Sequence, residues 1–147
     1  MNADPRALYQ DVILEHNRHS KHKGPQPIPP ARYAEGHNPL CGDRVEVYAS
    51  VDDQNTLEKV TFESTGCAIC TASASMMAGA VQGRSVDEAR GVWDRFRTLV
   101  TEGGEAEGLG DLHALGGVRA FPMRVKCATL AWHTLFEALE KTPEDQP

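Results

Sequence analysis

The sequence predicts an α+β fold in which helices pack on one face of a small antiparallel sheet of about three strands. Strand-like alternation of apolar and polar residues is confined to residues 32–65, whereas helical periodicity occurs before and after this region. The turn-forming run Asp-Asp-Gln-Asn at 52–55 separates two strand-like segments closely enough for a hairpin or meander. Strands and helices that are segregated along the chain are typical of α+β folds.

The first half of the chain contains one helix and the strands. Asp4 is a candidate N-cap and Pro5 a favoured first helical residue, so the first helix is predicted to begin there and to end near Arg18. The proline-rich segment 24–30 is a connector to a weak strand at 32–37. The two clearer strands are predicted from their alternating residues, Val45, Val47, Ala49 and Val51 in one and Val60, Phe62 and Ser64 in the other.

The second half is predicted to be helical. A run of small and apolar residues at 68–82 forms one helix, which ends at Gly83, and a capping-box pattern at 85–88 begins the next. The glycine- and glutamate-rich segment 102–110 is an exposed loop, and a short helical turn follows at 111–115. Pro122 begins the last helix. Its predicted buried residues are Val125, Leu130, Ala131, Leu135, Phe136 and Leu139.

Length and composition restrict the class of protein. The 147 residues are enough for one domain, 1–147, with a disordered tail predicted at 142–147. A net charge of −6 argues against nucleic acid as a partner. No apolar run is long enough to span a membrane and residues 1–5 lack a signal-peptide pattern, so we expect a cytoplasmic protein with no membrane partner. In a reducing compartment, four cysteines favour metal or sulfur chemistry over disulfides.

Three of the four cysteines lie in positions that suit a metal–thiolate site. Cys41 is followed by Asp43 in a loop, Cys67 separates a strand from a helix, and Cys127 lies at the start of the last helix. Three thiolates and a carboxylate suit Zn²⁺ or iron. The dipole at a helix N-terminus favours the thiolate form of Cys67 and Cys127. Each motif alone is a weak signal, and their combination predicts a metal site.

Other candidate ligands are weaker. Cys70 forms a Cys-x-x-Cys with Cys67, a spacing used in both zinc and redox sites, and it competes with Asp43 as a ligand. A packed thiol is the favoured interpretation of Cys70. The histidines at three-residue spacing are interpreted as cations at a helix C-terminus and in the loop beyond it rather than as ligands; they are His16, His19 and His22.

The chain resembles the U-type iron–sulfur cluster assembly proteins, and specifically their SufU branch. The motifs that carry the resemblance are residues 38–43 (Asn-Pro-Leu-Cys-Gly-Asp), 66–69 (Gly-Cys-Ala-Ile), 71–77 (Thr-Ala-Ser-Ala-Ser-Met-Met) and 124–132 (Arg-Val-Lys-Cys-Ala-Thr-Leu-Ala-Trp). The resemblance implies that zinc, or alternatively iron or a [2Fe–2S] cluster, is bound by Cys41, Asp43, Cys67 and Cys127. It also implies a SufS-type cysteine desulfurase and a downstream SufBCD-type scaffold complex as partners.

Two departures from the scaffold branch of that family favour sulfur transfer. Scaffold-type members carry a Leu-Pro-Pro-Val-Lys stretch and a histidine before the last cysteine, whereas this chain has Phe-Pro-Met-Arg-Val at 121–125 and Lys126. The segment between Cys67 and Cys127, which contains the glycine-rich stretch 103–110, is also longer than in the scaffold-type members. We therefore expect a zinc-dependent persulfide carrier with Cys41 as the acceptor, because a loop cysteine leaves a metal with little strain. The alternatives are a scaffold that assembles and transfers a [2Fe–2S] cluster, and a purely structural zinc site.

Overall fold

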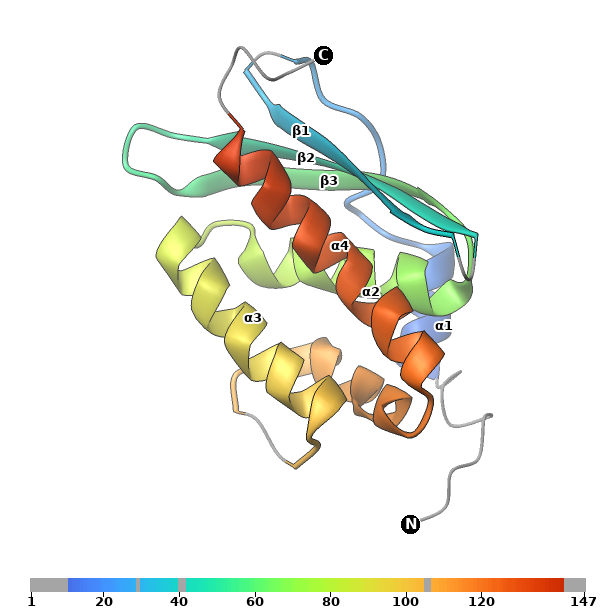
Figure 1. Ribbon diagram of the computed structural model, residues 1–147. Helices are drawn as coiled ribbons and strands as arrows, with labels where there is room; N and C mark the ends of the chain where they lie inside the picture. The colour runs from blue at the N-terminus through green and yellow to red at the C-terminus, as the bar shows by residue number, and fades with distance from the viewer. Residues whose placement is uncertain (1–10, 29, 40–41, 105–106, 142–147) are drawn as a thin grey trace.

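The computed structural model describes residues 11–28, 30–39, 42–104 and 107–141 and has the predicted α+β architecture (Figure 1). The elements run in the order α1 (Asp11–Arg18), β1 (Arg32–Asn38), β2 (Asp43–Val51), β3 (Leu57–Thr65), α2 (Ala68–Val81), α3 (Val86–Thr101), the 3₁₀ helix η2 (Gly110–Ala120) and α4 (Pro122–Glu140). The predicted start of the first helix and the predicted disordered tail lie outside the described residues.

The three strands form one antiparallel sheet in the order β1-β2-β3. Asn38 pairs with Asp43 across the β1–β2 hairpin, and Arg44 pairs with Thr65 between β2 and β3. Because of this register, the end of β1, the start of β2 and the end of β3 lie together at one end of the sheet. The segment that leads into α2 therefore begins beside Asp43.

Helices cover one face of the sheet, as predicted. α4 packs on β1 and β2, α2 packs on β3 and on α4, and α1 packs on α2, while α3 and η2 contact each other in an outer layer (Figure 1). Trp132 of α4 is fully buried and stacks against both Trp93 and Phe96 of α3, with ring centroids 5.7 Å apart in both pairs. This cluster ties the outer layer to the helix that carries Cys127.

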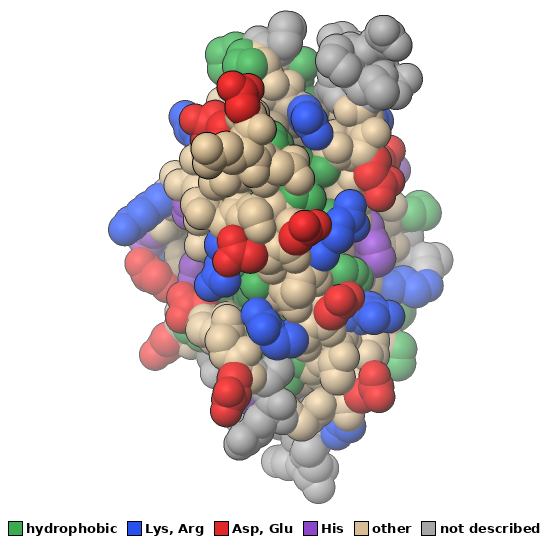
Figure 2. Space-filling view, turned by 90° about the vertical axis from the view of Figure 1, so that its left-hand side faces the viewer, with side chains coloured by type: hydrophobic (Ala, Val, Ile, Leu, Met, Phe, Trp, Pro, Cys, Tyr) green, Lys and Arg blue, Asp and Glu red, His purple; other side chains and the backbone are tan. Residues whose placement is uncertain are grey.

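The connector before β1 lies against the other face of the sheet. The buried Gln26 amide donates hydrogen bonds to the backbone carbonyl of Tyr48 and to Oγ1 of Thr61, and its oxygen accepts one from Ser50. On the side of the molecule drawn in Figure 2, acidic and basic side chains are interspersed. Within the described residues, the helices are too short or too polar to cross a membrane.

The largest difference from the sequence-based expectation is η2. A short turn was expected at 111–115, but the 3₁₀ helix continues to Ala120 through two glycines. Its buried residues are Leu112, Leu115 and Val118. Their spacing of three places them on one edge, because side chains at i and i+3 eclipse in a 3₁₀ helix. The two glycines suggested a loop, although the three-residue spacing of the buried residues is typical of a 3₁₀ helix.

Candidate metal centre

Three potential ligands from different elements converge at the end of the sheet that carries the β1–β2 hairpin. Asp43 is the first residue of β2, Cys67 is the N-cap of α2, and Cys127 is the sixth residue of α4. One carboxylate oxygen of Asp43 and the sulfurs of the two cysteines all lie within 4.8 Å of one another. The strand register and the packing of α2 against α4 thus bring together residues up to 84 positions apart.

Gly66 allows the connection between β3 and α2 to pass directly against Asp43. The backbone N–H of Cys67 donates a hydrogen bond of 2.9 Å to Oδ1 of Asp43. Gly66 has φ +142°, and a Cβ atom at this position would lie 2.8 Å from the Asp43 Cα. Glycine meets both requirements, because it adopts positive φ easily and has no side chain. The close approach positions the Asp43 carboxylate beside the N-terminus of α2.

The environment of Cys67 favours its thiolate form. The hydrogen bond from the Cys127 thiol lowers the pKa of Cys67 to about 6, although burial and the Asp43 carboxylate act in the opposite direction. The backbone N–H groups of Cys70 and Ile69 also lower this pKa, and the Cys70 nitrogen lies 3.4 Å from the Cys67 sulfur. These contacts favour the thiolate, which is the form that binds metal or attacks a disulfide.

Cys127 lies farther inside its helix than the sequence suggested. It is in the second turn of α4 and fully buried, and its sulfur lies 3.5 Å from the carbonyl oxygen of Met123. The electrostatic effect of a helix N-terminus falls off within the first turn. The helix-dipole argument thus applies to the N-cap residue Cys67 and not to Cys127.

The charges at this site fit a bound cation. Asp43 is 0% exposed, and within the described part of the chain no basic side chain forms an ion pair with it. Its Oδ2 lies 3.9 Å from the ionisable sulfur of Cys67. A carboxylate and a thiolate at this separation repel each other, and burial of the Asp43 charge without a compensating cation is costly. Two thiolates and a carboxylate are donors that suit zinc or iron.

The other two cysteines lie apart from this group of ligands or outside the described residues. Cys41 falls outside the described residues, between Pro39 and Gly42, so its assignment as a ligand stays a prediction. Cys70 is fully buried in the hydrophobic core and does not belong to the group formed by Asp43, Cys67 and Cys127. This placement agrees with the interpretation of Cys70 as a packed thiol.

Substitution of Gly66 by alanine is expected to weaken zinc binding as well as to destabilise the fold through backbone strain. The positive φ costs about 1–3 kcal/mol of unfolding free energy for a residue with a Cβ, and the new methyl would displace Asp43. Gly83→Ala is the matched control, because Gly83 has φ +88° but a Cβ added there would have no other atom within 4 Å. Chemical denaturation and zinc titration of both variants check this. Equal zinc affinity in the two variants would contradict the positioning role of Gly66.

Comparison with known proteins identifies the family. Residues 8–146 match the family described as NifU-like N terminal domain. The chain belongs to this family. It is 36% identical over 142 residues to a zinc-dependent sulfurtransferase SufU from Bacillus subtilis (strain 168), a match that covers 95% of each chain. It is also 36% identical over 141 residues to an iron–sulfur cluster assembly scaffold protein IscU from Streptococcus pyogenes serotype M1, covering 95% of this chain and 87% of the relative.

Solved structures agree with this assignment. The crystal structure of a putative SUF-system scaffold protein from Fervidobacterium islandicum AW-1 superposes with a TM-score of 0.83 at 31% identity, covering 93% of this chain and all of that chain. An N-terminal NifU-like protein from Brucella abortus also gives a TM-score of 0.83, at 28% identity, covering 95% and 96% of the two chains. The resemblance inferred from the cysteine motifs and the predicted fold are both confirmed.

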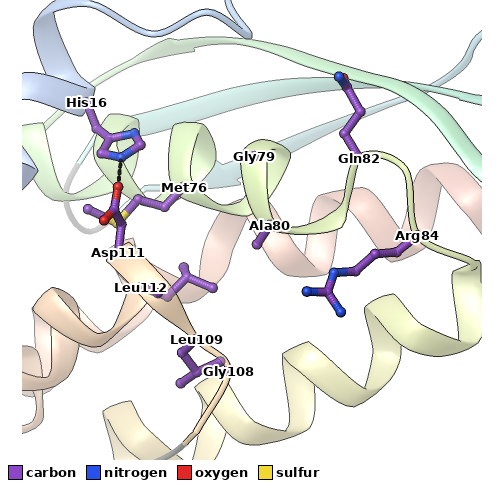
Figure 3. A pocket seen from close by; sticks show the side chains of 11 residues that line it. His16, Met76, Gly79, Ala80, Gln82, Arg84, Gly108, Leu109, Asp111 and Leu112 are labelled. Atoms are coloured by element: carbon purple, nitrogen blue, oxygen red, sulfur yellow. Dashed lines mark hydrogen bonds and ion pairs between the residues drawn. The ribbon is translucent and has the colours of Figure 1, made fainter.

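Sequence reasoning about this NifU-like domain missed a second polar site. His16, interpreted from the sequence as a helix-terminal cation, lies 2.7 Å from Oγ of Ser75 through Nδ1 and 2.8 Å from Oδ2 of Asp111 through Nε2. These contacts help to link α1, α2 and η2. His16 and Asp111 also line a hollow of about 470 Å³ (Figure 3). Asp111 is 95 residues from His16, and no local motif connects them. No residue of the candidate metal centre lines this hollow.

Proposed function

We propose that this NifU-like domain is a zinc-dependent sulfur acceptor that receives sulfur from a cysteine desulfurase and passes it on for iron–sulfur cluster assembly. The observation that carries the proposal is the convergence of Asp43, Cys67 and Cys127 within 4.8 Å, beside the hairpin that contains Cys41. Similarity over 95% of the chain to a protein named as a zinc-dependent sulfurtransferase supports it. When bound, zinc keeps coordinating thiols deprotonated and held in place.

Cys41 is the proposed acceptor and fourth ligand. It is two residues from Asp43, so the two Cα atoms lie no more than about 7 Å apart in any conformation. In the transfer step, the Cys41 thiolate attacks the outer sulfur of a persulfide on the desulfurase. A new S–S bond forms at Cys41, the bond within the donor persulfide breaks, and the desulfurase cysteine leaves as a thiolate. Asp43, Cys67 and Cys127 would hold the zinc while Cys41 reacts.

Lys126 favours this chemistry over cluster assembly. It is exposed and immediately precedes Cys127. A protonated lysine has no lone pair with which to bind metal, whereas a histidine at this position has one. The positive charge of Lys126 attracts an anionic persulfide or an acidic segment of a partner. The proposed partners are a SufS-type desulfurase and a downstream SufBCD-type complex in the cytoplasm, with residues 1–147 acting as one domain.

A scaffold function is the second candidate, favoured by the 36% identity to a protein named as an IscU scaffold. The same four residues, Cys41, Asp43, Cys67 and Cys127, would then hold a [2Fe–2S] cluster as cargo. One oxygen ligand among three thiolates makes such a cluster more labile than four cysteines would, which suits transfer.

Anaerobic reconstitution with iron, cysteine and a desulfurase separates the two candidates. We expect little stable [2Fe–2S] absorbance from the parent chain. Lys126→His should raise cluster retention on the order of 10-fold, the scale on which changes around the ligands affect metal binding. Lys126→Gln is the matched control, since it removes the charge without adding an imidazole. A parent chain that forms a stable cluster and transfers it to an apo-ferredoxin would favour the scaffold function instead.

A further inference from the structure

The Cys67-Ala68-Ile69-Cys70 spacing is a feature that the proposed metal centre does not explain. Cys67 is the half-buried N-cap of α2, and Cys70, fully buried, is the third residue of the helix. The Cys70 backbone N–H donates a hydrogen bond of 3.4 Å to the Cys67 sulfur. Neither cysteine is in a disulfide. The helix thus begins with two reduced cysteines, one half-buried and one fully buried.

This arrangement has the properties of a redox-active dithiol. Residues three apart in a helical turn are neighbours on one face, with Cβ atoms about 5–6 Å apart, and a disulfide spans Cα···Cα distances of about 4.4–6.8 Å. In Cys-x-x-Cys redox sites, a thiolate stabilised at the helix N-terminus reacts first. The Cys70 N–H stabilises the Cys67 sulfur in the same way. The backbone N–H would be present with other residues at position 70, and what the cysteine adds is a second thiol three residues from Cys67.

We propose that Cys70 resolves a persulfide carried by Cys67 and thereby releases hydrosulfide. This inference deepens the proposed function, on which it rests for the supply of sulfur. When it is not coordinated to metal, the Cys67 thiolate takes the outer sulfur from the persulfide that the proposed function supplies, and the donor cysteine leaves as a thiolate. Cys70 then attacks the inner sulfur, Sγ of Cys67, and its thiol proton passes to the departing outer sulfur, because the fully buried Cys70 is not in contact with solvent. The Sγ–Sγ bond between Cys67 and Cys70 forms, the bond to the outer sulfur breaks, and that sulfur departs with the electron pair and this proton as hydrosulfide.

A second thiol is needed to supply electrons when persulfide sulfur is released as hydrosulfide. Sulfur in a persulfide is at the zero-valent level, whereas a cluster contains sulfide, so two electrons must be supplied. Oxidation of Cys67 and Cys70 to a disulfide supplies both electrons. An external dithiol reductant then restores the pair by thiol–disulfide exchange. The domain would in this way deliver sulfide rather than only persulfide.

The tryptic peptides of this chain make the proposal directly testable. Cys41 lies in residues 33–44, Cys67 and Cys70 lie together in 60–84, and Cys127 lies in 127–141. The full-length chain, stripped of metal, is treated anaerobically with glutathione persulfide, and the released sulfide and the alkylated peptides are measured. We expect hydrosulfide release together with a 60–84 peptide that is lighter by two hydrogen atoms. Zinc-loaded protein should react more slowly, because a coordinated Cys67 is not available.

Variants define which thiol acts. In Cys70→Ser, the 60–84 peptide should retain one extra sulfur atom on Cys67, and sulfide release should fall to that of the reagent alone. Cys70→Ala provides a second variant that preserves an apolar side chain, and circular dichroism verifies that both fold. Undiminished sulfide release from both variants, or a disulfide joining peptides 60–84 and 127–141 in the parent chain, would overturn the assignment of Cys70. Because no desulfurase is present, either result leaves sulfur acceptance at Cys41 as a separate question.

Discussion

A Cys41→Ala chain is expected to lose its stimulation of a partner cysteine desulfurase completely. Without the acceptor sulfur, the persulfide on the desulfurase has no thiolate to receive its outer atom, and turnover with cysteine falls to that of the desulfurase alone. Some zinc should remain bound, because Asp43, Cys67 and Cys127 converge independently of Cys41. Desulfurase turnover, measured with and without the variant, checks this expectation.

The control for this experiment lies at the opposite end of the sheet. Asp53 is exposed in the turn between β2 and β3, and Asp53→Ala should stimulate the desulfurase as the parent does. Cys41→Ser preserves the size of the side chain while removing the thiol, and it should fail in the same way as alanine. Stimulation by Cys41→Ala at the parental level would show that another cysteine accepts the sulfur.

Removal of zinc is expected to lower the thermal stability of the domain substantially. A ligand that binds only the folded state adds about 4 kcal/mol when its free concentration is 1,000 times its Kd. For a chain of this size, that corresponds to a decrease in Tm of about 8–16 °C on chelation. The bound cation also offsets the repulsion between the Asp43 carboxylate and the Cys67 thiolate, which lie 3.9 Å apart.

Differential scanning calorimetry of zinc-loaded and chelated protein measures this difference. Asp43→Ala is the matched variant, because it removes one ligand and the buried negative charge together. Its chelation should produce a smaller decrease in Tm than that of the parent. An unchanged melting curve after verified loss of metal would show that the core is stable without the site.

Local sequence patterns predicted much of the fold. The capping box is present as expected: Ser85 and Glu88 exchange backbone and side-chain hydrogen bonds at the start of α3. The strands follow the predicted alternation, with Val45, Val47 and Ala49 all fully buried. These patterns are readable because caps and strand periodicity depend on residues close in the chain. The extent of η2 was missed because its glycines suggested a loop.

The candidate site was predictable in composition but not in its contacts. Metal-binding residue types at loop and helix-start positions pointed to Asp43, Cys67 and Cys127 before their proximity was known. The passage of Gly66 against Asp43 depends on the β2–β3 register, and the His16–Asp111 pair depends on the packing of α1 near η2. Such relations arise from tertiary structure, and a single sequence provides no local pattern for them.

The most direct test of the central claim is to locate the sulfur after reaction with a desulfurase. The zinc-loaded chain is incubated anaerobically with cysteine and the desulfurase, quenched by alkylation, digested with trypsin and analysed by mass spectrometry. Our account predicts one added sulfur atom on the peptide of residues 33–44, which contains Cys41 as its single cysteine. A 33–44 peptide without added sulfur at every time point, while the desulfurase turns over, would contradict the account.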